Sequence, residues 1–162
     1  MLNLKEFTKN LLIDREMKQK IDFFSRVSIF NGLTRFAIGK LVTAMYSRKY
    51  EAGEIICSEN ELGKALFIIM NGEVGITRKS GMLRQEKIIS HLKSGEFFGE
   101  MAMLEEKPRV ATAKALTDCE LYIIYKANFD NMIEKDPKIG LLVIKNISVI
   151  LSARLRGMIN GG

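Results

Sequence analysis

The chain has 162 residues, a length typical of one domain that buries its core without disulfide bonds. No run reaches the ~18 to 20 apolar residues that a membrane-spanning helix needs. The N-terminus lacks the pattern of a secretory signal, so a cytoplasmic location without a membrane span is expected.

The formal net charge of +6 comes from the N-terminal third of the chain. Residues 1–50 hold ten Lys/Arg and four Asp/Glu, whereas residues 51–162 hold fifteen of each. A solvated helix face explains such a basic segment, and so does a surface for an acidic partner, a membrane surface or nucleic acid. The balanced remainder gives no strong footprint for phosphate backbones, so no binding to nucleic acid is expected.

Residues suited to metal or nucleophile chemistry are few. Cys57 and Cys119 lie far apart in the sequence and His91 is the single histidine, so no metal site is expected. Both cysteines are predicted to be reduced and packed, and His91 to lie on a strand at or near the surface. No nucleophile stands beside an evident base, which predicts that the chain is not an enzyme and needs no cofactor.

Two helices are predicted before the first strand. Apolar residues at near-helical spacing predict an amphipathic helix over about residues 3–22, which we separate as an N-terminal element (1–22) from one domain over 23–162. These apolar positions are Leu4, Phe7, Leu11, Ile13 and Met17. A second helix is predicted over 34–45, with Thr34 as its N-cap.

Strand signals dominate from about residue 46 to residue 125. Short apolar or alternating runs there are separated by turn residues typical of antiparallel hairpins. The turn residues are Gly53, Gly63, Asn71–Gly72, Ser80–Gly81 and Ser94–Gly95. About eight strands at this spacing favour a jelly-roll-like antiparallel β-roll, and therefore a mainly β fold with flanking helices.

Helices are predicted again over about residues 127–159. The first starts near Phe129 and stops near Asp136–Pro137, because the residue before a proline disfavours helical geometry. A long helix follows over about 139–159, with an apolar stripe too wide for one ordinary core contact. Its members are Leu142, Val143, Ile144, Ile147, Ile150, Leu151, Leu155 and Met158. Core packing and contact with a second surface are both open for this stripe.

A different pattern interrupts the strands between residues 98 and 112. It consists of Phe98, Gly99, Glu100, Met101 and Ala102, followed after a short loop by Arg109, Val110, Ala111 and Thr112. The glycine lets the backbone approach a ligand closely, the following residues can open a helix whose amides face an anion, and the arginine supplies a fixed cation. Taken singly, these residues suit a turn or a surface ion pair. Together they predict a site for a phosphate.

This segment resembles the phosphate-binding cassette of the cyclic nucleotide-binding domain family, which includes catabolite activator-type regulators and regulatory subunits of protein kinase A. That family's pattern is Phe/Ile-Gly-Glu-x-Ala-x-Leu, a short loop, and Pro-Arg-x-Ala-Thr, and this chain carries all of it. Flanking strand and helix patterns extend the resemblance over about residues 24–158. It implies a β-roll with a short phosphate-binding helix that acts as a non-catalytic, stand-alone sensor without a DNA-binding domain.

The resemblance also implies a role for individual residues. Gly99 and Ala102 would give backbone contacts, Glu100 would bind the ribose 2′-hydroxyl, Arg109 the phosphate, and Thr112 would support the pocket. The final helix would fold over the base as a lid, pair with its twin in a homodimer, or do both. Candidates for contact with the base are Arg154, Leu155 and Met158.

The resemblance favours cAMP as the ligand. Relatives that prefer cGMP usually carry a serine or threonine directly after the arginine, where this chain has Val110. Three alternatives stay open: a cGMP-binding module, a protein-interaction scaffold that uses the same fold without ligand, and a fragment of a DNA-binding regulator. The last is disfavoured because too few residues follow the long helix for a winged helix-turn-helix. The downstream protein partner is unknown.

Overall fold

The structure is a computed structural model that describes residues 4–80 and 85–160, and the side chains of residues 13–79 and 86–159. The predicted turn residue Gly81 and the apolar side chains Leu4, Phe7 and Leu11 lie outside these described residues. The chain divides into two compact units. One is Ala44–Leu141, and the other combines Met1–Thr43 with Leu142–Gly162. No helix within the described ranges is long and apolar enough to cross a membrane.

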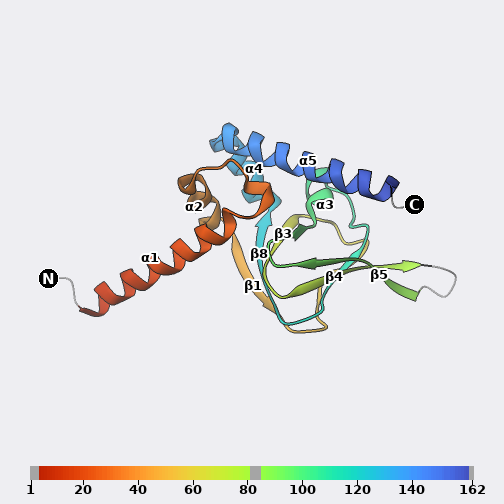
Figure 1. The fold of residues 1–162 in the computed structure, drawn as a ribbon, viewed down its shortest axis with the longest axis horizontal. Helices are drawn as coiled ribbons and strands as arrows, with labels where there is room; N and C mark the ends of the chain where they lie inside the picture. Colours follow the sequence, from red (N-terminus) through yellow and green to blue (C-terminus); the bar gives the residue numbers. More distant parts are fainter. Residues whose placement is uncertain (1–3, 81–84, 161–162) are drawn as a thin grey trace. The chain divides into compact units, whose positions relative to one another are not determined.

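Eight antiparallel strands make two four-stranded sheets in the unit Ala44–Leu141 (Figure 1). The first sheet has the order β1 (Tyr46–Tyr50), β8 (Cys119–Tyr125), β3 (Ala65–Asn71) and β6 (Phe97–Phe98). The second has the order β2 (Ile55–Cys57), β7 (Thr112–Ala115), β4 (Glu73–Ser80) and β5 (Gln85–Lys93). The predicted fold class, a mainly β roll of about eight antiparallel strands with flanking helices, is confirmed.

The hydrophobic core of this unit takes side chains from both sheets. Alternate residues of a strand point to the same face, so every second residue of β3 and β8 enters the core. The core consists of Tyr50, Cys57, Ala65, Phe67, Ile69, Val74, Leu92, Phe98, Ala113, Ala115, Cys119, Leu121 and Ile123. Its packing fixes β3, β6 and β7, the strands that flank the segment predicted to bind a phosphate.

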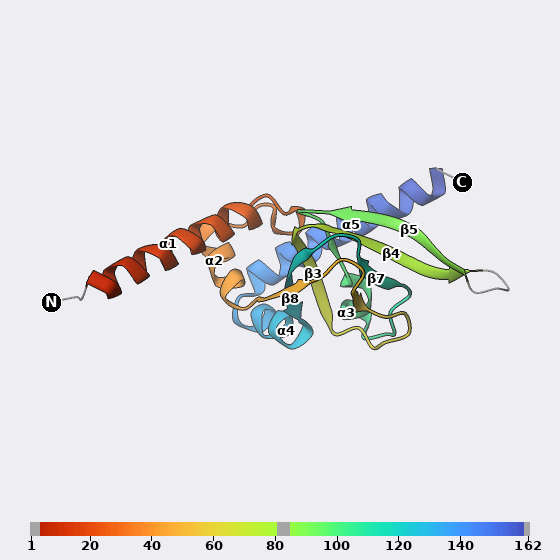
Figure 2. The ribbon, with the colours of Figure 1, turned by 90° about the horizontal axis from the view of Figure 1, so that it is seen from below.

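The longest strand pair is the β4–β5 hairpin, which extends beyond the other strands of its sheet (Figure 2). At the start of β4 the chain turns tightly at Gly72, where φ is +89°. A Cβ on this glycine would lie 2.4 Å from the Asp118 carbonyl oxygen and 2.7 Å from Cys119 Sγ. The turn therefore needs glycine both for its backbone conformation and for space.

Two short helices and the start of a long one complete the unit. Helix α3 (Glu100–Glu105) follows β6, and α4 (Lys126–Lys135) follows β8 and buries Phe129. The predicted stop near Asp136 is confirmed. Helix α5 (Pro137–Asn160) begins two residues earlier than predicted, because proline is tolerated at the first helical position, where its missing N–H costs no hydrogen bond.

The other unit is helical. It contains α1 (Leu4–Phe24), the 3₁₀ turn η1 (Ser28–Phe30), α2 (Arg35–Thr43) and the later part of α5. The predicted N-cap is confirmed, since the Ala37 N–H donates to Thr34 Oγ1 over 3.2 Å. The second helix ends two residues earlier than predicted. The side-chain amide of Asn146 on α5 donates to the carbonyl of Ile29 (3.0 Å), a contact that the sequence pattern did not predict.

Candidate ligand-binding site

Arg109 lies in the connection between α3 and β7, where the loop 58–63 holds its backbone. The Arg109 N–H donates to the Glu61 carbonyl oxygen over 2.8 Å, and the Arg109 carbonyl oxygen accepts from the Asn60 N–H over 2.9 Å. Both backbone polar groups of Arg109 are thereby satisfied by one loop. The position of this arginine depends on a segment almost fifty residues earlier in the chain.

The guanidinium of Arg109 is buried, with the residue only 8% exposed. Its Nη2 donates to the Ala65 carbonyl oxygen over 3.3 Å, and its Cζ lies 5.3 Å from the centre of the Phe67 ring. That ring is itself stacked on Phe98, with 5.0 Å between the ring centres. The Ala65 carbonyl and the Phe67 ring are neutral partners of this cation. A buried guanidinium is a fixed positive charge with several N–H donors, so it can bind an anion.

Gly99 brings the start of α3 against this guanidinium. It is the N-cap of α3, with φ at 84° and ψ at 1°. A Cβ at this position would lie 2.8 Å from Arg109 Nη1 and 2.8 Å from the Ala65 carbonyl oxygen. The left-handed conformation and the close approach both require glycine, as the sequence pattern indicated.

Helix α3 adds a buried carboxylate and a close backbone contact. Glu100 in its first turn is 4% exposed and Ala102 is 8% exposed. A Cβ on Gly63 would lie 2.1 Å from the Ala102 Cβ, so the loop 58–63 packs directly on this helix. The first N–H groups of any helix lack carbonyl acceptors within that helix. A cation, a carboxylate and the first turn of a helix therefore lie within one short segment.

The remaining predicted residues of the segment differ in exposure. Phe98 is buried, whereas Met101 and Val110 are exposed, at 46% and 62%. Ala111 and Thr112 are half-buried. The Thr112 hydroxyl accepts a hydrogen bond from the backbone N–H of Glu59 over 3.0 Å, which again ties the segment to the loop 58–63.

Two titratable groups lie within the electrostatic field of Arg109. Burial raises the pKa of the Cys57 thiol above its usual value, and the positive charge of Arg109 acts in the opposite direction. Hydrogen bonds from the backbone and side chain of Ser58 lower the pKa of the Glu61 carboxyl, and Arg109 adds to this effect. The cation therefore favours negative charge in its surroundings, as a phosphate site requires.

Comparison with known proteins decides the family. The family model described as "Cyclic nucleotide-binding domain" matches residues 47–136, more than half of the chain. The chain belongs to the cyclic nucleotide-binding domain family. The matched range contains the whole segment from Phe98 to Thr112 and the loop 58–63.

Relatives of this cyclic nucleotide-binding domain include much longer proteins. The chain is 31% identical over 127 residues to a cAMP-dependent protein kinase regulatory subunit of Eremothecium gossypii, covering 78% of this chain and 25% of that protein. It is 36% identical over 104 residues to the cGMP-dependent protein kinase egl-4 of Caenorhabditis briggsae, covering 64% of this chain and 14% of that protein. The chain thus spans a quarter or less of these two relatives.

A solved structure of similar fold is the catabolite activator protein of Thermus thermophilus. It superposes with a TM-score of 0.73 at 31% sequence identity, covering 81% of this chain and 59% of that protein. The resemblance to catabolite activator-type regulators and to regulatory subunits of protein kinase A is therefore confirmed at the level of the family and the fold.

The structure brings two predicted site residues of the domain, Gly99 and Arg109, together. Gly99 is in direct contact range of the Arg109 guanidinium, and Glu100 follows it in the chain. The predicted lid residues lie on α5 in the helical unit, where Leu155 is 58% and Met158 is 75% exposed. Their role, like that of Arg154, stays a prediction.

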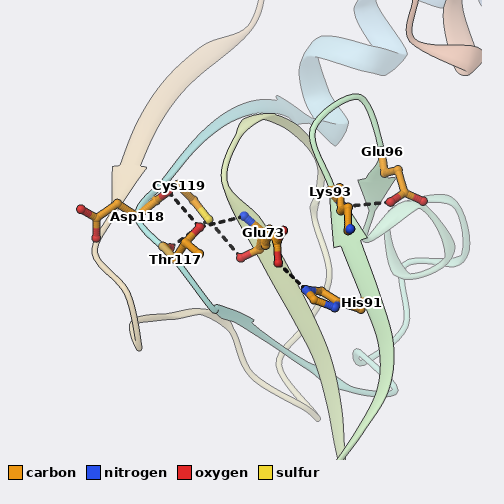
Figure 3. Close-up of polar contacts among 7 residues, drawn as sticks. All are labelled: Glu73, His91, Lys93, Glu96, Thr117, Asp118 and Cys119. Carbon is orange, nitrogen blue, oxygen red and sulfur yellow. Dashed lines mark hydrogen bonds and ion pairs between the residues drawn. The ribbon is translucent and has the colours of Figure 1, made fainter.

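His91 and Cys119 of the domain have structural partners (Figure 3). His91 Nε2 lies 2.8 Å from Glu73 Oε2, which joins β5 to β4. The buried thiol of Cys119 donates to the Glu73 carbonyl oxygen (3.3 Å) and to that of Thr117 (3.2 Å). Both cysteines are free and buried, which confirms the predicted packing. Across the described part of the chain, no group of three His, Cys, Asp or Glu side chains could hold a metal ion.

The loop 58–63 is the part of the site that the sequence pattern did not reveal. It supplies the backbone partners of Arg109, yet none of its residues was predicted to belong to the site. One signal was available, because Ser58 and Glu61 stand three residues apart, the spacing at which a carboxylate can bond back to an earlier backbone N–H. That spacing predicts a closed turn but not the segment against which the turn packs.

Proposed function

We propose that this domain is a non-catalytic regulatory module that binds cAMP and signals occupancy through its C-terminal helices. The observation that carries the proposal is the buried guanidinium of Arg109, directly against the glycine that starts α3. A 3′,5′-cyclic phosphate carries one negative charge. Its burial needs a fixed cation and several N–H donors in place of water, and this segment can provide both.

Each residue of the segment has a part in this proposal. Arg109 binds the cyclic phosphate, and the backbones of Gly99 and Ala102 donate to its oxygens. Glu100 accepts a hydrogen bond from the ribose 2′-hydroxyl, because an ionised carboxylate can only accept. Thr112 supports the site through its bond from the Glu59 N–H.

The preference for cAMP over cGMP rests on Val110. This residue is 62% exposed, and its side chain has no hydroxyl with which to bond the 2-amino group of guanine. cGMP is the alternative ligand, and the names of the relatives do not discriminate, since they include proteins named for each nucleotide. The relative affinity of the two nucleotides decides between them.

Signalling in this proposal requires two states of the C-terminal helices that bind ligand unequally. Arg154, Leu155 and Met158 on α5 would close over the base in the occupied state. Conversion of a mostly open population to a mostly closed one requires ~10⁴-fold tighter binding by the closed state. A comparison of α5 in the free and bound protein tests this. If α5 had the same position in both forms, the domain would bind its ligand without signalling through this helix.

Calorimetric titration with cAMP and with cGMP tests the binding site itself. Arg109→Ala should weaken binding by about 2–5 kcal/mol, because it leaves a buried anion without its cation. Arg48→Ala is the matched control, since it removes the same charge from an exposed position of β1. Lack of binding of either nucleotide to the unmodified protein would favour the scaffold alternative, and a preference for cGMP would change the assigned ligand.

A further inference from the structure

We propose that Glu61 is a positioning residue for Arg109: its carboxylate closes a turn whose backbone sets the place of the guanidinium. This inference rests on the proposed function, because the consequence that matters is the hold of Arg109 on a phosphate. Glu61 itself contacts no ligand in this account. Its side chain acts on Ser58, and its effect reaches Arg109 through main-chain hydrogen bonds.

Main-chain hydrogen bonds join the loop 58–63 to the segment 107–109. Glu61 accepts from the Arg109 N–H (2.8 Å) and the Asn60 N–H donates to the Arg109 carbonyl oxygen (2.9 Å). The Gly63 N–H donates to the Lys107 carbonyl oxygen over 3.3 Å. The two segments thus run together as a short antiparallel pair. Both the N–H and the carbonyl oxygen of Arg109 are hydrogen-bonded to the loop. Displacement of the loop would displace the arginine.

Two hydrogen bonds between Ser58 and Glu61 hold the loop in this shape. The Ser58 N–H donates to Glu61 Oε2 over 3.0 Å, and the Glu61 N–H donates to the Ser58 carbonyl oxygen over 3.2 Å. Asn60, between them, has φ at +69°, a left-handed conformation that few residues other than glycine and asparagine adopt readily. A reciprocal pair of bonds therefore closes the turn, and one of the two depends on the Glu61 carboxylate.

The guanidinium itself contacts neutral groups of β3. Its Nη2 bond to the Ala65 carbonyl oxygen is 3.3 Å long, and the Phe67 ring gives a face but no hydrogen-bond acceptor of fixed direction. The loop 58–63 sets the point from which this side chain extends, because it holds the Arg109 backbone on both polar groups. A cation fixed in place before ligand arrives loses less freedom on binding, which raises affinity.

A double-mutant cycle with cAMP as the probe tests this chain of contacts. Glu61→Ala should weaken binding about tenfold, whereas Glu61→Gln should bind nearly as the unmodified protein, since the amide oxygen can accept the same Ser58 N–H. In an Arg109→Ala background, Glu61→Ala should cause no further loss. Equal affinity of Glu61→Ala and the unmodified protein, or a full tenfold loss without Arg109, would overturn the proposal.

Glu96 provides a matched control within the same domain (Figure 3). Its Oε2 accepts from the Lys93 N–H over 2.8 Å, so Glu96→Ala removes the same kind of carboxylate-to-amide contact from a turn remote in sequence from Arg109. Affinity for cAMP should stay unchanged in this variant. A loss equal to that of Glu61→Ala would mean that closing any such turn matters to the fold alone, and would overturn the positioning role.

Amide hydrogen exchange tests the same inference without ligand. The Arg109 N–H, bonded to Glu61, should exchange about tenfold faster in Glu61→Ala, while the Ile69 N–H, bonded to the Glu96 carbonyl oxygen, should be unaffected. Unchanged exchange at Arg109 would overturn the proposal. If the unmodified protein binds neither nucleotide, the proposed function fails, and the exchange measurement alone then decides whether Glu61 positions Arg109.

Discussion

At the scale of single residues, the site depends on two glycines for different physical reasons. Gly99 is needed for its left-handed backbone and for the nearness of the guanidinium. Gly63 is needed for space alone, because Ala102 on α3 fills the volume that a side chain would take. The small residue in the cassette and the small residue in the loop are therefore one packing unit, contributed from two parts of the chain.

Gly63→Ala should destabilise the protein by about 1–3 kcal/mol, the usual cost of an extra methyl group in a packed contact. The added Cβ would lie 2.1 Å from the Ala102 Cβ, so the loop and α3 must separate. Urea unfolding measures the change. Gly157→Ala on α5, where a Cβ would meet nothing within 4 Å, is the control and should be neutral or slightly stabilising. Equal stability of the two variants would contradict the steric account.

At the scale of elements, Lys126 links α3 to α4 in the strand-rich unit. Its Nζ lies 2.8 Å from Asp130 Oδ2 and 3.2 Å from Oε1 of Glu106, the C-cap residue of α3. The Lys126 N–H donates to the Lys64 carbonyl oxygen over 2.8 Å. The start of α4 is thus bonded both to the end of the cassette helix and to the residue that precedes β3.

The pH dependence of this link follows from the Lys126 ammonium. Hydrogen bonds to Asp130 and then to Glu106 raise its pKa above the ordinary 10.5. A raised pKa means that the stabilisation is fully present below 10.5 and is lost as the pH rises through the value of the folded state. Lys126→Met should therefore lower the melting temperature at pH 7, by about 1–3 °C, and should match the unmodified protein at strongly alkaline pH.

Lys107→Met is the control for this measurement. Lys107 pairs with Glu105 over 3.1 Å, but its side chain is 71% exposed against 24% for Lys126, so water screens the pair more strongly. Lys107→Met should therefore change the melting temperature less than Lys126→Met does. If the melting temperatures of Lys126→Met and the unmodified protein still differed at strongly alkaline pH, the stabilisation by Lys126 would come from packing and not from charge.

At the scale of the whole molecule, pairing with a second copy of the chain through α5 stays a prediction from the family resemblance. Exposed or half-buried residues recur along α5 at spacings of three and four, the pattern of a coiled coil. These seam residues are Leu141, Ile144, Ser148, Leu151, Leu155 and Met158. Pairing of this helix with its twin would bury the apolar members and would give the homodimer that the resemblance implies as an alternative or an addition to a lid.

Sedimentation should therefore show a dimer, and Leu155→Glu should shift the protein toward monomer, since it places two like charges in the seam. Val149→Glu is the control. This residue is similarly exposed, at 59% against 58%, and lies outside the three-and-four spacing, so the variant should remain dimeric. A monomeric unmodified protein would contradict the seam, and a dimer of Leu155→Glu would place the interface elsewhere.

Most of the fold could be predicted from local signals in the sequence. The turn glycine Gly72, the cap at Thr34 and the stop near Asp136 act over a few residues, so they were predicted and are found in the structure. The signal in the segment from Phe98 to Thr112 was equally local, since its residue types and spacing identified the family before any fold was known. The roles of its residues stay predictions that the proposed titrations test.

Only the tertiary structure decided which distant segments support that site. The bonds between Glu61 and Arg109, and the contact of Gly63 with Ala102, join residues about forty to fifty positions apart. No periodicity or cap signal encodes such a pair, because its partners become neighbours only after the sheets have closed around a common core. A sequence motif specifies its own backbone through nearby residues, whereas the place of a buried guanidinium is set by whatever the fold packs against it.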